Sequence, residues 1–558
     1  MPQKKPFFEH RWWSISALHN WKIFDETLAR ALKEAPRHNI TGMEFHDYNG
    51  SWVDTVMQFR NYPKLAKAAK LSYYAHKHGP AMLSMADSME VGRRYKKAAQ
   101  MCRDAGLEVQ VWYHCFRDWP KEAMELYPEL ADADGQPLYD YLTDTLNDCF
   151  EFLPEIAGIT VTSLHETPSI LRFSGGTTHA DRMHRLYTTL IAACDAHKRR
   201  LILRDFSIRK HELDDYSKVV DRLPDHVMLE TKCSLQDWAS HEKPLNPNVT
   251  RYAMKKKKLL VEFDISNNFA GEMEMPWCIP DQIWRRMRMI ASLGAVGGIG
   301  WLVNTDEVTV GTIFDTPNEV NVWALSRFLQ DPGKLLVDPD DEWDREYDQM
   351  DMTCWTDWAK LRFGETAAAE VVELLRRSGR VCELTFNICG GYFFWCRYAD
   401  ANMKKEHMKR AIYKPYSHFQ SATRAVRRCG YELARIEKAE AARLVEDALE
   451  RVEKLKPVLP PDGYQNLHGS FMRARHIVGI YRAMCDAFLL ALEVDAGRED
   501  RQALLAATAK LRTAADETAA AYSDNLFEGT PRGARAVAEF LEEVPGRVEE
   551  ILKISGHD

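Results

Sequence analysis

Gly158-Ile-Thr-Val-Thr-Ser-Leu-His-Glu-Thr-Pro168 joins a buried segment to a polar turn. Its β-branched residues, interspersed with small polar ones, predict a short buried strand over 158–163. Pro168 and its restriction of the preceding residue end regular structure there. Parallel-barrel enzymes carry their chemistry at the C-terminal tips of strands, so Glu166 is the first candidate catalytic residue. The alternative is a solvated loop glutamate that caps the next segment.

Seven other apolar runs of strand length accompany this one in the first part of the chain. Helical patterns such as Met89–Ala105, His179–His197 and Ile283–Leu293 separate them. This alternation predicts an α/β fold, a (β/α)8 TIM barrel over residues 1–333. A doubly wound open sheet is the alternative, although no glycine-rich phosphate loop follows the first strand. The predicted strands are Trp12–Ile15, Gly42–Phe45, Val109–His114, Gly158–Ser163, Leu201–Phe206, Val227–Lys232, Leu259–Ile265 and Gly297–Val303.

Strand signals almost vanish after Asp331-Pro-Gly333, and helical periodicity replaces them. We therefore expect an all-helical C-terminal domain over residues 334–558, docked on the barrel or forming a homodimer. The helical runs are Trp355–Arg377, Met403–Val452, Tyr464–Val494 and Asp500–Asp524.

The amino-acid composition limits which kinds of partner the protein can have. The net charge of -8 provides no basic footprint for nucleic acid, and no stretch is long enough to span a membrane. The first residues contain no apolar signal-peptide core. A cytoplasmic location follows if Met1 is the native start, and a periplasmic or secreted one if a signal peptide was removed. The 15 tryptophans suit either sugar-ring platforms or a large core.

Polar residues follow nearly every predicted strand and would converge on one barrel mouth. The structural alternative is a set of ion pairs inside the barrel, in which Arg204 is paired with Glu230 or Asp205. The residues at the strand ends are His46, Asp47, Trp112, His114, His165, Glu166, Arg204, Asp205, Glu230, Lys232, Asp237, Glu262, Asp264, Asn268, Trp301 and Asn304.

The residue types at these ends favour one chemistry. His46, His114 and His165 could ligate a metal, but no short His-x-His or His-Glu-x-x-His spacing supports one, and we expect neither metal nor cofactor. Nucleophilic serine or cysteine catalysis lacks its motif. Two carboxylates on different strands, flanked by aromatic and cationic residues, suit glycoside hydrolysis best.

Residues 109–332 resemble the catalytic barrel of the α-glucuronidases of glycoside hydrolase family 67. The order of four segments carries the resemblance, and it implies an inverting, exo-acting hydrolase that removes an α-linked uronic acid from oligosaccharides. The segments are Gly158-Ile-Thr-Val-Thr-Ser-Leu-His-Glu166, Leu201-Ile-Leu-Arg-Asp-Phe206, Glu230-Thr-Lys-Cys-Ser-Leu-Gln-Asp237 and the barrel exit Pro317–Pro332.

The resemblance also implies roles for single residues. Glu166 matches the general acid and Asp237 the general base, while Arg204 and Lys232 match the cations that meet the uronate carboxylate. Asp264, on the same strand face as Glu262, is a reserve candidate for the base. Candidates for ring packing and hydroxyl contacts are Trp112, His114, His165, Asn268, Trp301 and Asn304.

Three differences from the family 67 pattern change what we expect of the substrate. Thr162 stands where the family has another uronate-binding lysine, and Asn268 where it has a second candidate base. Strand-like barrel sequence is reached by Trp12, without the N-terminal domain usual in that family. We therefore expect a distant relative with a changed substrate. The alternatives are a catalytically weakened carbohydrate-binding protein and a hydrolase of neutral sugars on the same barrel.

Overall fold

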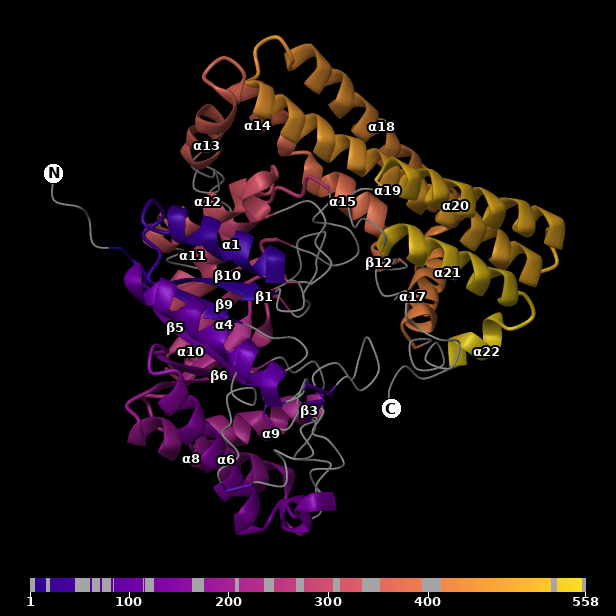
Figure 1. The fold of residues 1–558 in the computed structure, drawn as a ribbon. Coiled ribbons are helices and arrows are strands. Elements are labelled where there is room, and N and C mark those ends of the chain that lie inside the picture. Colours follow the sequence, from indigo (N-terminus) through magenta and orange to yellow (C-terminus); the bar gives the residue numbers. More distant parts are fainter. Residues whose placement is uncertain are drawn as a thin grey trace.

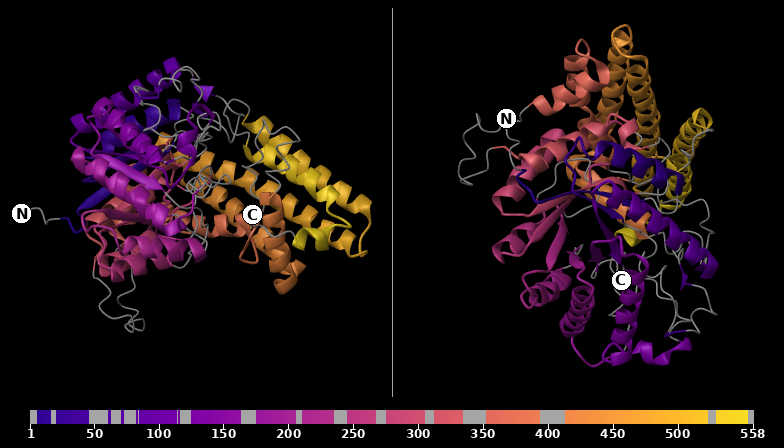
Figure 2. Two further views of the ribbon diagram at one scale, coloured as in Figure 1. Left: turned by 90° about the horizontal axis from the view of Figure 1, so that it is seen from below. Right: turned by 60° about the vertical axis from the view of Figure 1, so that its left-hand side comes forward.

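A computed structural model of the chain consists of a barrel with a layer of long helices beside it (Figure 1). Two further views show that these helices extend away from one side of the barrel (Figure 2). The structure describes residues 6–16, 21–45, 61–62, 71–72, 82–83, 85–113, 115, 125–162, 175–205, 210–234, 245–266, 275–304, 312–333, 352–393, 413–522 and 529–553.

Eight parallel strands close into a barrel in the order β1-β10-β9-β8-β7-β6-β5-β2, which confirms the predicted TIM barrel. Each strand also falls on a predicted run. A separate antiparallel pair, β3 (Leu71–Ser72) and β4 (Met82–Leu83), lies outside the barrel. The barrel strands are β1 (His10–Ser16), β2 (Gly42–Phe45), β5 (Glu108–Tyr113), β6 (Gly158–Thr162), β7 (Arg200–Asp205), β8 (Met228–Lys232), β9 (Leu259–Phe263) and β10 (Gly297–Asn304).

Helices surround the strands because the outward-facing strand residues are apolar and must be covered. Val111, Val161, Leu203 and Val261 belong to one large core shared with these helices. The helices are α1 (Trp21–Glu34), α4 (Met85–Asp104), α6 (Gln136–Phe152), α8 (His179–Ala196), α9 (Lys210–Val220), α10 (Pro247–Met254), α11 (Pro280–Ser292) and α12 (Glu319–Gln330), with 3-10 turns η1 (Pro128–Ala131) and η3 (Ile313–Asp315).

The barrel interior begins with an apolar layer. Trp12 fills much of it, and an added Cβ on its register partner Gly42 would lie 2.6 Å from the indole nitrogen. Only glycine therefore fits at position 42 beside this tryptophan. Since inward positions recur every second residue, the next inward residues lie nearer the C-terminal ends of the strands. The apolar layer consists of Trp12, Ile202, Met228, Leu260 and Ile299.

The helical region follows α12 and has its own hydrophobic core. None of the helices in the described part is both long and apolar enough to cross a membrane. The helical region also contains an antiparallel pair of two-residue strands, β11 (Asn387–Ile388) and β12 (Gly391–Tyr392). Its helices are α13 (Thr353–Phe363), α14 (Ala368–Leu375), α15 (Ser378–Phe386), α17 (Tyr413–Cys429), α18 (Tyr431–Leu455), α19 (Pro461–Asp495), α20 (Arg501–Ala521), α21 (Gly529–Glu543) and α22 (Val548–Lys553).

Two predicted helical runs are in fact broken. The sequence predicts one helical run over Met403–Val452, but α17 and α18 are separated at Gly430, whose φ is 89°. Trp355–Arg377 likewise divides after Gly364, whose φ is 82°. A helix cannot continue through a left-handed residue, and glycine adopts that conformation at little steric cost. Residues 403–412 lie outside the described residues.

Buried polar contacts join the helical region to the barrel. Glu319 at the start of α12 accepts a hydrogen bond from the Trp358 indole at 2.9 Å and one from Arg362 Nε at 2.6 Å. The backbone N–H of Cys278, just before α11, donates a hydrogen bond to the Ser378 hydroxyl of α15 at 2.9 Å. The division of the chain at residues 333 and 334 stays a prediction, because residues 334–351 lie outside the described part.

Candidate active site

A buried polar layer lies above the apolar one, toward the C-terminal ends of the strands. Strand registers put its members on the same inward face. Each member is at most 2% exposed, so water does not screen their charges as it would at a surface. The polar layer consists of Glu44, Trp112, Thr160, Arg204, Glu230, Lys232, Glu262 and Trp301.

Arg204 on β7 is held between two carboxyl groups. Its Nε lies 2.6 Å from Glu262 Oε2 and 3.2 Å from Glu230 Oε1. The guanidinium carbon also lies 4.3 Å from the centre of the Trp112 ring, which is cation–π geometry. These contacts compensate for the hydration free energy that the Arg204 guanidinium loses on burial.

Lys232, the last residue of β8, links the polar layer to the barrel rim. Its Nζ lies 2.6 Å from Glu262 Oε1 and 3.0 and 3.2 Å from the two oxygens of Asp264. The Asp264 side chain is 12% exposed, against 3% for that of Lys232. Asp264 therefore lies at the more exposed edge of this charged cluster.

The carboxyl groups of the polar layer differ in the direction in which their pKa values are shifted. Burial raises the pKa of Glu230 well above its ordinary value, and the neighbouring Glu44 and Glu262 raise it further. Burial acts the same way on Glu262, but Arg204 and Lys232 outweigh it and lower the pKa of Glu262. The two neighbouring carboxyl groups are thus shifted in opposite directions, Glu230 toward its neutral form and Glu262 toward its anion.

Glu44 on β2 is a member that the sequence reasoning missed. It is fully buried, and its Oε2 accepts a hydrogen bond from the Thr160 hydroxyl at 2.8 Å. Burial raises the pKa of Glu44 to about 7, even though the Thr160 hydrogen bond lowers it. The sequence signal for Glu44 is a charged residue at an inward position of a strand, two residues before the predicted strand-end residue His46 and three before Asp47. Those two residues lie outside the described ones.

Asp205 follows Arg204 in the chain but faces the other way, because side chains alternate along a strand. Its Oδ2 accepts hydrogen bonds from the Tyr252 hydroxyl at 2.6 Å and from Asn248 Nδ2, both on α10. Of the two ion pairs considered for Arg204, the one with Glu230 is present and the one with Asp205 is not. The position of Asp205 therefore anchors α10 to the outside of β7.

The structure brings together several of the predicted site residues. Trp112 and Trp301 meet edge to face, with ring centres 5.6 Å apart, and Lys232 lies 5.3 Å from the Trp301 ring. The backbone of Asn304 ends β10. The remaining predicted site residues fall outside the described part of the chain, so their roles stay predictions; these are His114, His165, Glu166, Asp237 and Asn268.

The described residues include no group of three or more His, Cys, Asp or Glu side chains arranged to hold a metal ion. Glu262 and Asp264 form ion pairs with Arg204 and Lys232. The arrangement can orient the Asp264 carboxylate through Lys232, and it holds carboxyl groups with raised pKa values in the same layer as the two indole rings.

Comparison with known proteins gives a fold and no family. No family model matches the sequence, and no curated protein matches it either. A solved GH138 enzyme targeting pectin rhamnogalacturonan II matches with a TM-score of 0.60 and 10% identity, over 98% of this chain and 84% of that chain. That match shows a shared fold for the barrel and the helical region together.

A second solved structure is a GH115 4-O-methyl-α-glucuronidase with specificity for decorated arabinogalactans. It matches with a TM-score of 0.47 and 13% identity, over 97% of this chain and 62% of that chain. Neither structure is described as a family 67 enzyme, so the family 67 resemblance stays a prediction.

Proposed function

We propose that this protein is a glycoside hydrolase whose active site lies at the C-terminal end of the barrel. The observation that carries the proposal is the polar layer with Asp264 at its rim. Glycoside hydrolysis needs a carboxyl that gives a proton and a carboxylate that acts on water or carbon. The described part of the site supports this, because it shifts the pKa values of two neighbouring carboxyl groups, Glu230 and Glu262, in opposite directions beside the Trp112–Trp301 pair.

We keep Glu166 as the general acid and Asp237 as the general base, with Asp264 as the reserve base. Glu166 gives its proton to the glycosidic oxygen as the bond to the anomeric carbon breaks. The base takes a proton from the water that attacks the opposite face of the sugar. This inverting reaction requires the two carboxyl groups to be roughly 6.5–9.5 Å apart. Lys232 supports Asp264 in the reserve role, because its two contacts fix the carboxylate.

For the substrate we propose an α-linked uronic acid removed from the end of an oligosaccharide. Among the described residues, Lys232 is the cation that contacts Asp264 at the rim, and it would meet the uronate carboxylate. Arg204 lies deeper, between Glu230 and Glu262, and would act on the substrate by holding Glu262 against Lys232.

One observation favours a second candidate, a hydrolase of neutral sugars. Glu262 and Asp264 already balance the charges of Arg204 and Lys232. An anionic sugar would bind Lys232 only in exchange for Asp264, or with Asp264 protonated. A neutral sugar would accept hydrogen bonds from Lys232 without that exchange.

The deciding experiment gives the purified protein matched pairs of aryl glycosides and oligosaccharides that differ only in a terminal uronic acid or its neutral counterpart. Faster hydrolysis of the uronide supports the first candidate, and faster hydrolysis of the neutral glycoside supports the second. Absence of hydrolysis across both series contradicts a glycoside hydrolase. Proton NMR of the first-formed anomer then separates inversion from retention.

A further inference from the structure

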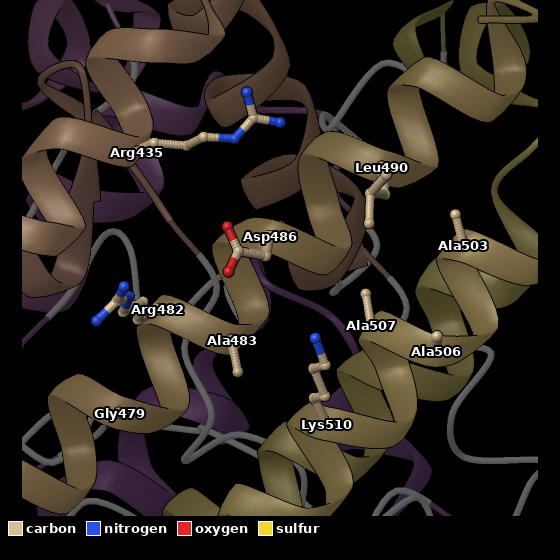
Figure 3. Close-up of a pocket in the computed structure, with 10 residues that line it drawn as sticks. All are labelled: Arg435, Gly479, Arg482, Ala483, Asp486, Leu490, Ala503, Ala506, Ala507 and Lys510. Carbon is tan, nitrogen blue, oxygen red and sulfur yellow. The ribbon is translucent and has the colours of Figure 1, made fainter. Parts of the chain in front are cut away.

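An open groove crosses the helical region, far along the chain from the barrel strands. It lies where α18, α19 and α20 meet and has a volume of about 410 Å³ (Figure 3). Both neighbouring helices pack along α19, so the groove follows the outer face of that helix. Its volume falls within the range of roughly 300–1,000 Å³ that is usual for small-molecule sites.

Small residues form the floor of this groove. They include Gly479 and Ala483 on α19 and Ala503, Ala506 and Ala507 on α20. A Cβ added to Gly479 would meet no heavy atom within 4 Å, so helix packing does not require a glycine there. Glycine within a helix is less favourable than alanine. Gly479 is exposed, so the space above it opens the groove to solvent and leaves room for a ligand.

Charged residues form the walls, and cations predominate. Arg435, Arg482 and Lys510 face a single carboxylate, Asp486, although the whole chain carries a net charge of -8. Arg435 lies 4.0 Å from its ion-pair partner Glu493, a long separation for such a pair. Arg482 and Lys510 form no ion pair with any residue of the described part. Figure 3 shows Arg435, Asp486 and Lys510 on three different helices around the groove.

We propose that this groove binds an acidic saccharide, a small molecule with a carboxylate or phosphate group and several hydroxyls. The three cations would attract the oxyanion, Lys510 would donate charge-assisted hydrogen bonds to it, and Asp486 would accept hydrogen bonds from the hydroxyls. None of the ten described lining residues is aromatic, so recognition is polar and not by ring stacking. This site is separate from the barrel and does not depend on the chemistry proposed there.

Titration calorimetry of the full chain with four probes tests the site: digalacturonate, glucose 6-phosphate, inorganic phosphate and cellobiose. Digalacturonate and glucose 6-phosphate distinguish a carboxylate from a phosphate ligand. Hydrogen exchange of residues 479–490 and 503–510 reports on the groove alone, so binding in the barrel is not mistaken for it. We expect at least one of these two acidic probes to bind and to slow exchange there.

Three variants make the result specific. Arg482→Ala combined with Lys510→Ala should weaken the binding by about tenfold or more, because charge-assisted hydrogen bonds are lost. Gly479→Leu keeps every cation but fills the floor, and should abolish binding. The control Lys454→Ala removes an exposed cation of α18 that does not line the groove, and should bind like the wild type.

Four outcomes overturn the proposal. They are no protection of the groove by either acidic probe, unchanged binding in the double variant, equal affinity for inorganic phosphate, and equal affinity for cellobiose. Should Gly479→Leu fail to fold, the double variant and its control decide alone. If the groove binds no ligand but the protein hydrolyses glycosides, only the groove proposal fails. If the groove binds its ligand but the protein hydrolyses no glycoside, only the proposed function fails.

Discussion

The polar layer and the groove both gather charged residues, but they differ in how these charges are compensated. Inside the barrel, Glu262 contacts both Arg204 and Lys232, and all three side chains are almost completely buried. In the groove, Arg482 and Lys510 are exposed and have no ion-pair partner in the described part. An unpaired charge costs several kcal/mol when it is buried, whereas an exposed charge is hydrated and can stay unpaired until a ligand binds. Substitutions should therefore affect stability in the first region and binding in the second.

The largest expected effect is that of Glu262→Gln. This change leaves two buried cations without their shared anion, and it should lower the free energy of unfolding by about 3–5 kcal/mol. Urea denaturation measures it. The control is Glu446→Gln, which breaks an exposed pair with Arg475 at 2.7 Å and should cost less than about 1 kcal/mol. Equal losses in the two variants would contradict the distinction between buried and exposed charges.

Glu44→Gln should change how stability depends on pH. The folded protein keeps the Glu44 proton up to a pKa of about 7, whereas the unfolded chain releases it near 4.5. The folded state therefore binds more protons between these values, and this contribution to stability falls as the pH rises from 4.5 to 7.

The fall is on the order of 3 kcal/mol, since each pKa unit corresponds to about 1.4 kcal/mol. Glutamine does not titrate, so Glu44→Gln should gain stability relative to the wild type above pH 7. Urea denaturation at pH 5 and pH 8 compares the two proteins. A difference between them that does not vary with pH would show that Glu44 ionises normally.

Gly479→Ala should stabilise the protein by about 0.5–1 kcal/mol, because alanine favours the helix and the added methyl group meets no neighbour. Thermal unfolding followed by circular dichroism measures the change. The matched comparison is Gly391→Ala, where the new Cβ would lie 2.9 Å from that of Ala425, and destabilisation is expected. A loss of stability in Gly479→Ala would contradict the open space above Gly479.

The smallest expected effect on stability is that of Arg482→Ala combined with Lys510→Ala. Exposed residues without ion-pair partners contribute little, so the free energy of unfolding should change by less than about 0.5 kcal/mol. Urea denaturation beside the wild type gives the value. A loss as large as that of Glu262→Gln would place these cations in the same structural class as the polar layer.

The barrel itself could be predicted from the sequence because its strands are short apolar runs separated by helical patterns. The direction of the Asp205 side chain could also have been predicted, since Asp205 directly follows Arg204 and its side chain must point to the opposite side of β7. The contact between Arg204 and Glu262 could not, because the two lie on strands separated by β8 and depend on the register of all three. The groove had no sequence signal, since it arises only where three helices pack.

The central claim is that the barrel hydrolyses glycosides with Glu166 as its general acid. The most direct measurement compares wild type and Glu166→Gln on two substrates with the same sugar, one with an activated aryl leaving group and one with a sugar leaving group. A general acid matters in proportion to the basicity of the oxygen it protonates. We predict near-complete loss of activity on the sugar-linked substrate and much smaller loss on the aryl glycoside. Wild-type rates on both would contradict the account.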